Sequence, residues 1–344
     1  MAEHRHFRHV HLVGSVPLAD SHAVFEAVSD TLGAIIPRIP DGETGDRTLW
    51  ILFQKQAMDR ATNLLKIKDY EFMPGVFQAT YGLADPALPV KFGHLRYAEE
   101  AKKSYQQFAS LKADGRIASS TRFQVCLPTP LAVVGTFVGL QSQQAVEEAY
   151  EARLLTELTE IMDSIPHQEL AIQWDVAWEM VYLEGWSAIP YFDTSKAGFV
   201  ERLGRLGRAV REDVELGFHL CYGDPGHRHL IEPKDLGHCV DIANSLGAAI
   251  RRRIDWIHMP VPKDRADEAY FAALKRLRVG ASTAIFLGLV HLTDGIEGAR
   301  LRMSVAENFL PWFGVATECG FGRRPPSSVM DLLELHKAVA QSDA

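Results

Sequence analysis

The segment GFHLCYGDPGHRH, residues 217–229, follows directly on an apolar run and leads into a loop that contains glycine and proline. An apolar run that ends in such a loop is typical of a buried β-strand. His219 and Cys221 are two residues apart, so on a strand their side chains point to the same face. This spacing suits a metal ion that prefers nitrogen and sulfur ligands. It suits equally a buried strand that carries one histidine and one cysteine, so the rest of the chain must distinguish the two.

The same alternation of apolar run, loop and amphipathic stretch recurs along the whole chain. Apolar runs predict strands at residues 9–15, 35–43, 120–130, 169–178, 214–223, 253–262, 282–295 and 313–325. Periodic stretches between them predict helices, the longest at residues 143–165. Alternation of this kind predicts a parallel sheet, and about eight units favour an α/β chain that is a single (β/α)8 TIM barrel over residues 1–344.

Two further features refine this prediction. A doubly wound open sheet is the alternative, but no glycine-rich nucleotide-binding motif follows the first predicted strand. Residues 55–120 are too many for a single connection. We therefore expect extra helices or a lid between the second and third strands.

Composition and charge narrow the class of partner. The chain has 344 residues, a net charge of −8 and four well-separated cysteines. Negative charge disfavours nucleic acid and anionic membranes, and four cysteines are too few for a disulfide framework in a chain of this size. The sequence shows no signal-peptide pattern and no apolar run of about 18 residues. We expect a cytoplasmic protein whose partner is a small-molecule substrate, and a homo-oligomer is compatible with the sequence.

Polar side chains gather at the carboxyl ends of the predicted strands, where barrel enzymes place their chemistry. These residues are Ser15, Glu43, Gln173, Asp175, His219, Cys221, His258, His291, Asp294, Glu318 and Cys319. A barrel interior filled only for packing would prefer valine, isoleucine and leucine. Histidine and cysteine side chains from neighbouring strands form a nitrogen and sulfur ligand set for which zinc is the usual ion.

Six short motifs occur in a fixed order along the chain. They are LVGSVP (12–17), PDGETGDR (40–47), CLPTPLAVV (126–134), IQWDVAW (172–178), HLCYGD (219–224) and ATECGFGRR (316–324). Together they resemble the catalytic barrel of cobalamin-independent methionine synthase, within the wider group that includes uroporphyrinogen decarboxylase. The resemblance extends over most of the chain and implies a zinc-dependent barrel enzyme.

The resemblance also implies a set of zinc ligands. His219, Cys221 and Cys319 match the histidine and the two cysteines that bind zinc in that family. The family's glutamate ligand is matched by His258, so the fourth ligand here is either this imidazole or absent. In the second case, His258 would form hydrogen bonds in the substrate pocket.

The predicted substrate pocket follows from the same comparison. Glu43 and Asp175 match the residues that bind the amino group of homocysteine, and Asp175 is alternatively a base. Ser15, Gln173 and Trp174 are predicted to bind substrate beside them. The proton-donating histidine of the family matches Thr293, so we expect His291 or Asp294 to handle the proton.

Two functions are compatible with these residues. The first is transfer of a methyl or alkyl group to a zinc-activated thiol. The alternative is a zinc-dependent carbon–carbon lyase, releasing formaldehyde or carbon dioxide from a small substrate. The tryptophans and phenylalanine near strand ends would suit an aromatic substrate; they are Trp174, Trp178, Trp256 and Phe286.

Basic residues at the end of one motif and histidines after another have roles that the sequence does not fix. Arg323 and Arg324 are either a clamp for an anionic group or a solvated pair of charges. His227 and His229 lie beyond Pro225 and Gly226, and we expect both to be surface residues.

Overall fold

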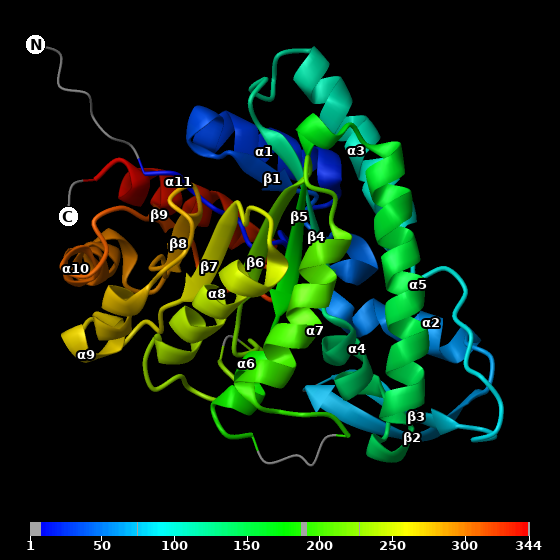
Figure 1. The fold of residues 1–344 in the computed structure, drawn as a ribbon. Coiled ribbons are helices and arrows are strands. Elements are labelled where there is room, and N and C mark those ends of the chain that lie inside the picture. Colours follow the sequence, from blue (N-terminus) through cyan, green and yellow to red (C-terminus); the bar gives the residue numbers. More distant parts are fainter. Residues whose placement is uncertain (1–7, 74, 187–190, 227, 343–344) are drawn as a thin grey trace, which may run out of the picture.

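The computed structural model describes residues 8–73, 75–186, 191–226 and 228–342. Its centre is a curled, seven-stranded parallel sheet with the strand order β1-β4-β5-β6-β7-β8-β9 (Figure 1). The strands are β1 (Arg38–Pro40), β4 (Arg122–Pro128), β5 (Leu170–Val176), β6 (Glu215–Leu220), β7 (Trp256–Pro260), β8 (Ala284–Gly288) and β9 (Gly314–Val315). Strands adjacent in this order follow one another along the chain once the hairpin β2–β3 is set aside, as in a TIM-like barrel.

Helices follow most of the strands and cover the outside of the sheet. The longer ones are α1 (Ser21–Leu32), α3 (Tyr97–Ala113), α5 (Gln143–Ser164), α7 (Lys196–Ala209), α8 (Gly237–Ile250), α10 (Gly295–Glu307) and α11 (Val329–Ala340). The shorter ones are α2 (Lys55–Arg60), α4 (Pro130–Phe137), α6 (Trp178–Leu183) and α9 (Glu268–Phe271). Helix α1 packs against α11, so the first and last helices are neighbours. No helix of the described residues is both long and apolar enough to cross a membrane.

The strand predicted at residues 9–15 is not formed as a regular strand, which corrects the prediction from the sequence. Only Val10 pairs there, in a parallel bridge with Val315, so the sheet of the described residues has seven strands. The carbonyl groups of Leu12 and Val13 instead accept hydrogen bonds from the side-chain amides of Gln124 (3.0 Å) and Gln173 (2.6 Å). Because side chains occupy these acceptors, a regular strand ladder does not extend along the segment.

The long connection at residues 55–120 contains an element that the sequence did not predict. Beside α2 and α3 lies an antiparallel hairpin, β2 (Leu64–Met73) and β3 (Val76–Leu83). The Tyr70 hydroxyl donates a hydrogen bond of 2.9 Å to the carbonyl of Thr136, which ties the hairpin to α4. The expected helices are present, and the hairpin lies next to α2 and α4 (Figure 1).

The interior of the sheet is closed at one end by aromatic side chains. Trp256 and Phe286 are fully buried there, and the Arg38 guanidinium lies 4.1 Å from the Trp256 ring centre. A Cβ atom at Gly217 would lie 1.9 Å from the indole of Trp256, so only glycine fits beside it. These two aromatic residues therefore pack the core and do not face a substrate, contrary to the suggestion from the sequence.

Two buried glutamates influence each other, Glu147 on α5 and Glu179 in the first turn of α6. Burial raises the pKa of Glu179 to about 7. Burial, and then the nearby Glu179, raise the pKa of Glu147 to about 8. Within the described part of the chain, Glu179 Oε2 has no hydrogen-bond partner. Glu147 forms an ion pair with Arg202, whereas ionising Glu179 without such a partner costs free energy.

We expect the folded state to lose stability as the pH rises from about 4.5 to about 8. The pKa of Glu179 is higher in the folded chain than in the unfolded chain, so its contribution is complete below about pH 4.5 and disappears above about pH 7. Between pH 5 and pH 9, the free energy of unfolding should fall in both proteins, and the fall should be up to about 3 kcal/mol smaller in the Glu179→Gln variant than in the wild type. Urea unfolding at both pH values measures this difference. Glu148→Gln, on the exposed face of α5, is the matched control, and equal slopes for Glu179→Gln and wild type would contradict the prediction.

Candidate metal centre and adjoining pocket

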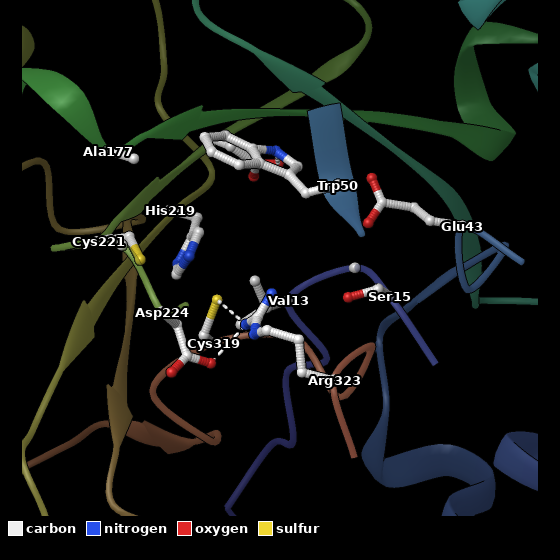
Figure 2. Close-up of a pocket in the computed structure, with 14 residues that line it drawn as sticks. Val13, Ser15, Glu43, Trp50, Ala177, His219, Cys221, Asp224, Cys319 and Arg323 are labelled. Carbon is white, nitrogen blue, oxygen red and sulfur yellow. Dashed lines mark hydrogen bonds and ion pairs between the residues drawn. The ribbon is translucent and has the colours of Figure 1, made fainter. Parts of the chain in front are cut away.

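Three of the predicted metal ligands converge at the carboxyl end of the sheet. His219 is on β6, Cys221 follows that strand directly, and Cys319 lies in the loop after β9 (Figure 2). One candidate ligand atom from each lies within 4.8 Å of those of the other two, and no other group of three such residues in the described ranges is so arranged. The parallel register places His219 beside Asp175 of β5 and His258 of β7.

The two thiols behave as a matched pair. Hydrogen bonding with Cys319 and burial raise the pKa of Cys221 well above its ordinary value. Hydrogen bonding from Cys221 lowers the pKa of Cys319 well below its ordinary value. Two neighbouring cysteine sulfurs and a buried imidazole form a donor set that zinc prefers. The residues present therefore fit the ion that the resemblance implies.

His258 contacts His219 and is not part of the three-residue group. Its Nε2 lies 2.9 Å from the carbonyl of Thr317, which can only accept, so Nε2 carries the proton. Burial lowers the pKa of His258 well below its ordinary value, so the ring is neutral and its Nδ1 accepts a hydrogen bond. The donor is His219 Nδ1 at 2.7 Å. This tautomer leaves the lone pair of His219 on Nε2, as metal binding requires.

A pocket with about 450 Å³ of empty space, partly open to solvent, lies over these residues. Besides the three candidate ligands, it is lined by Ser15, Glu43, Trp50, Asp175, Asp224 and Arg323. Figure 2 shows Glu43 and Trp50 on one side of this space and Arg323 on the other. The structure therefore brings Ser15, Glu43 and Asp175 together with the candidate ligands, as predicted from the sequence.

Asp175 is held by two hydrogen-bond donors. Its Oδ1 accepts from Gln173 Nε2 at 2.8 Å, and its Oδ2 accepts from Trp50 Nε1 at 3.1 Å. Burial raises its pKa to about 6. At neutral pH most of the chains therefore carry an ionised carboxylate there, which can bind a cationic group or accept a proton.

Glu43 is held in an unusual backbone conformation. Its φ is +47°, a left-handed value that costs a non-glycine residue about 1–2 kcal/mol. The Asp41 side chain accepts the Glu43 backbone N–H at 2.9 Å and is itself held by Arg47 and Ser104. Burial, followed by the nearby Asp175, raises the pKa of Glu43 well above its ordinary value. Two buried carboxyl groups, Glu43 and Asp175, thus face the same space, and burial raises the pKa of each.

Ser15 fixes the loop that carries Cys319. Its Oγ accepts a hydrogen bond of 3.2 Å from the Gly322 backbone, and its carbonyl accepts one of 2.7 Å from Phe321. A Cβ atom at Gly320 would lie 2.4 Å from Ser15 Oγ. The CGFG sequence therefore needs its first glycine because the serine of LVGSVP lies against it.

Two of the residues predicted to bind substrate do not line this pocket. Trp174 lies between Gln173 and Asp175, so strand alternation turns its buried indole to the opposite face of β5. Gln173 points inward and supports Asp175 without facing the pocket. The tryptophan that does line the pocket is Trp50, from a short 3-10 helix (Trp50–Gln54) after β1. No motif marked it, because an irregular segment brings it in from a distant part of the chain.

The predicted proton-handling residues lie outside the pocket. Strand β8 ends at Gly288, so His291 and Asp294 are in the following loop and not on the strand as predicted. Asp294 forms an ion pair with Arg302, at 2.6 and 3.0 Å. His291 bonds to the Val261 carbonyl at 2.9 Å, and its other ring nitrogen lies 3.7 Å from Glu318.

One further prediction from the sequence is corrected, and one of two open alternatives is excluded. The His229 side chain is only 6% exposed and lies 3.4 Å from Glu318, so the prediction of a surface residue is wrong. His227 lies outside the described residues. Arg323 forms an ion pair with Asp224 and a hydrogen bond of 3.4 Å with Cys319 Sγ, so it is not a solvated charge.

The fold resembles two solved structures. The first is a B12-independent methionine synthase from Shewanella sp. W3-18-1 in complex with selenomethionine, with a TM-score of 0.65, 16% sequence identity, and coverage of 97% of this chain and 96% of that chain. The second is a putative vitamin-B12 independent methionine synthase from Listeria monocytogenes, with a TM-score of 0.53, 14% identity, and coverage of 93% and 86%. The chain has a methionine-synthase-like fold. No protein-family model and no curated protein matches its sequence.

Proposed function

We propose that the protein is a zinc-dependent enzyme that transfers a methyl or alkyl group to a thiol substrate. The observation that carries the proposal is the convergence of His219, Cys221 and Cys319 on a pocket whose wall holds Glu43 and Asp175. The likeness in fold to methionine synthase structures supports it, since one of them binds selenomethionine, a selenium analogue of a methylated thiol. We also propose that residues 9–13 complete the barrel between β9 and β1, because Val10 donates to Ile35 and Val315 donates to His9.

In this mechanism, His219, Cys221 and Cys319 would hold a zinc ion. An ion held there would lower the pKa of the substrate thiol, so that a thiolate nucleophile would be available at neutral pH. Asp175, ionised at neutral pH and oriented by Trp50 and Gln173, binds the substrate's ammonium group. Arrival of that positive charge favours ionisation of the neighbouring Glu43, so both carboxyl groups orient the substrate. The proton of the thiol leaves to the solvent through the open side of the pocket.

A second candidate function is the lyase, and one observation favours it. Next to the first pocket lies a second one of about 570 Å³, lined mainly by apolar and aromatic side chains. Trp50, Phe72 and Trp178 contribute to it, and the two pockets share Trp50 and Arg323. An aromatic alcohol or acid could place its ring there while Asp175 acts as the base.

A product assay distinguishes the two functions. Zinc-loaded protein is mixed with homocysteine and a panel of donors with an isotope-labelled methyl group, and transfer to sulfur is followed by mass spectrometry. In parallel, aromatic hydroxymethyl compounds and acids are screened for release of formaldehyde or carbon dioxide. We expect labelled methionine from wild type and none from Cys221→Ser. Release of a one-carbon product without any transfer to sulfur would establish the lyase and overturn the transferase.

His258 is expected to support the metal centre through His219. The His258→Leu variant should bind zinc about 10- to 100-fold more weakly, as is typical when the hydrogen-bond partner of a metal ligand is lost. Glutamine can accept from His219 Nδ1 and donate to the Thr317 carbonyl, so His258→Gln should recover most of the affinity. Competition with a fluorescent chelator measures both variants. If His258 were itself the fourth ligand, glutamine would fail to restore binding.

A further inference from the structure

The two loops that carry the candidate thiol ligands are joined by an ion pair. Asp224 lies three residues after Cys221, beyond the left-handed turn at Gly223 (φ +71°). Arg323 lies four residues after Cys319. The guanidinium of Arg323 pairs with the Asp224 carboxylate, and both side chains are only 14% exposed. A contact between buried partners on different loops holds those loops at a defined separation.

The same guanidinium also contacts a candidate ligand atom. Arg323 Nη2 donates to Cys319 Sγ at 3.4 Å, and Figure 2 shows this contact together with the pairing to Asp224. Arg323 lines both adjoining pockets, so it lies at the junction between the metal centre and the apolar pocket. A hydrogen bond to a metal-bound sulfur withdraws electron density from it and alters the properties of the metal.

We propose that Arg323 is a positioning residue of the metal centre that clasps the two thiol-bearing loops through Asp224 and tunes the ion through its hydrogen bond to Cys319. The inference rests on the metal centre of the proposed function. The clasp brings Cys221 and Cys319 together before the ion arrives, which reduces the ordering that metal binding must otherwise impose. The hydrogen bond would reduce the electron density that the Cys319 sulfur donates to the ion. The ion would therefore be a stronger Lewis acid toward a substrate thiol.

Cobalt(II) provides a test that does not depend on activity. Cobalt bound by thiolates shows a charge-transfer absorption band whose energy reports the electron density on sulfur. In Arg323→Lys the ion pair with Asp224 can persist while the aligned N–H to sulfur is lost, so we expect the band to move to lower energy. Arg323→Met should show the same shift and an increase in the cobalt dissociation constant of about 10- to 100-fold. Asp224→Asn breaks the clasp but leaves the hydrogen bond to sulfur, so affinity should fall while the band stays in place.

Arg324→Met is the matched control, because it removes the same charge one residue along the loop. Among the described residues, Arg323 and not Arg324 donates a hydrogen bond to the Cys319 sulfur. An unmoved band in both Arg323 variants would overturn the proposal, and so would an equal shift in Arg324→Met. Circular dichroism checks that each variant is folded. If Arg323→Met does not fold, the band position in Arg323→Lys tests the proposal on its own. Absence of cobalt binding in wild type would overturn the metal centre together with this inference, whereas cobalt binding with an unmoved band overturns the inference alone.

Discussion

The Cys221→Ser variant is expected to lose the metal ion of this protein. Wild type purified with zinc should hold about one ion per chain, and the variant should hold almost none at the same free zinc concentration. A serine hydroxyl does not ionise at neutral pH and is a poor zinc ligand, so His219 and Cys319 alone would remain. We expect the zinc affinity to fall by more than about a hundredfold, above the loss that follows removal of a ligand's hydrogen-bond partner.

Elemental mass spectrometry on dialysed protein measures this change. The matched control is Cys239→Ser, because Cys239 is also fully buried but lies on α8, where it contacts the Tyr222 hydroxyl at 3.6 Å. This control should keep its zinc. Equal zinc content in wild type and Cys221→Ser would contradict the metal centre, and the acidic residues of the pocket would then need a different chemistry.

The Asp175→Asn variant is expected to bind an amino-thiol substrate about a hundredfold more weakly. Asparagine retains the shape and can accept only one of the two hydrogen bonds, from either Gln173 or Trp50, and it carries no charge to pair with a substrate ammonium group. Loss of one partner of a buried charged pair typically costs about 2–5 kcal/mol. Titration calorimetry of zinc-loaded protein with homocysteine measures the effect.

A thiol without the amino group separates this role from the others. The compound 4-mercaptobutyrate should bind wild type and Asp175→Asn equally if Asp175 recognises the ammonium group. Equal weakening for both thiols would show that Asp175 acts on the sulfur or on the metal site instead. Asp30→Asn, on the exposed side of α1, removes a carboxylate without touching the pocket and should leave both affinities unchanged.

Much of the sheet could be predicted because its signals are local. The runs around β4, β5, β6 and β7 are apolar enough to predict buried strands, and the structure confirms them. The hairpin β2–β3 was missed because its exposed residues, such as Lys66 and Asp69, hide the strand pattern. The end of β8 was placed too late, since the apolar residues after Gly288 continue the pattern without the pairing.

The candidate site was predictable where a short spacing on one strand carries it. The two-residue interval of His219 and Cys221 places both side chains on one face, and the motif order adds Cys319, Glu43 and Asp175. Trp50 was not predictable, because its place in the pocket depends on an irregular segment. Trp174 was predicted in the pocket although the same alternation that unites its neighbours excludes it.

The sequence by itself determined the alternation of strands and helices and the identity of the side chains at the strand ends. These are properties of a few adjacent residues, set by backbone periodicity and by burial of apolar groups. Only the tertiary structure decided which nitrogen of His219 remains for a metal, and which charges Arg323 and Asp294 meet. Those outcomes depend on distances between residues far apart in the chain, and such distances become defined only when the sheet curls and its loops meet at one end.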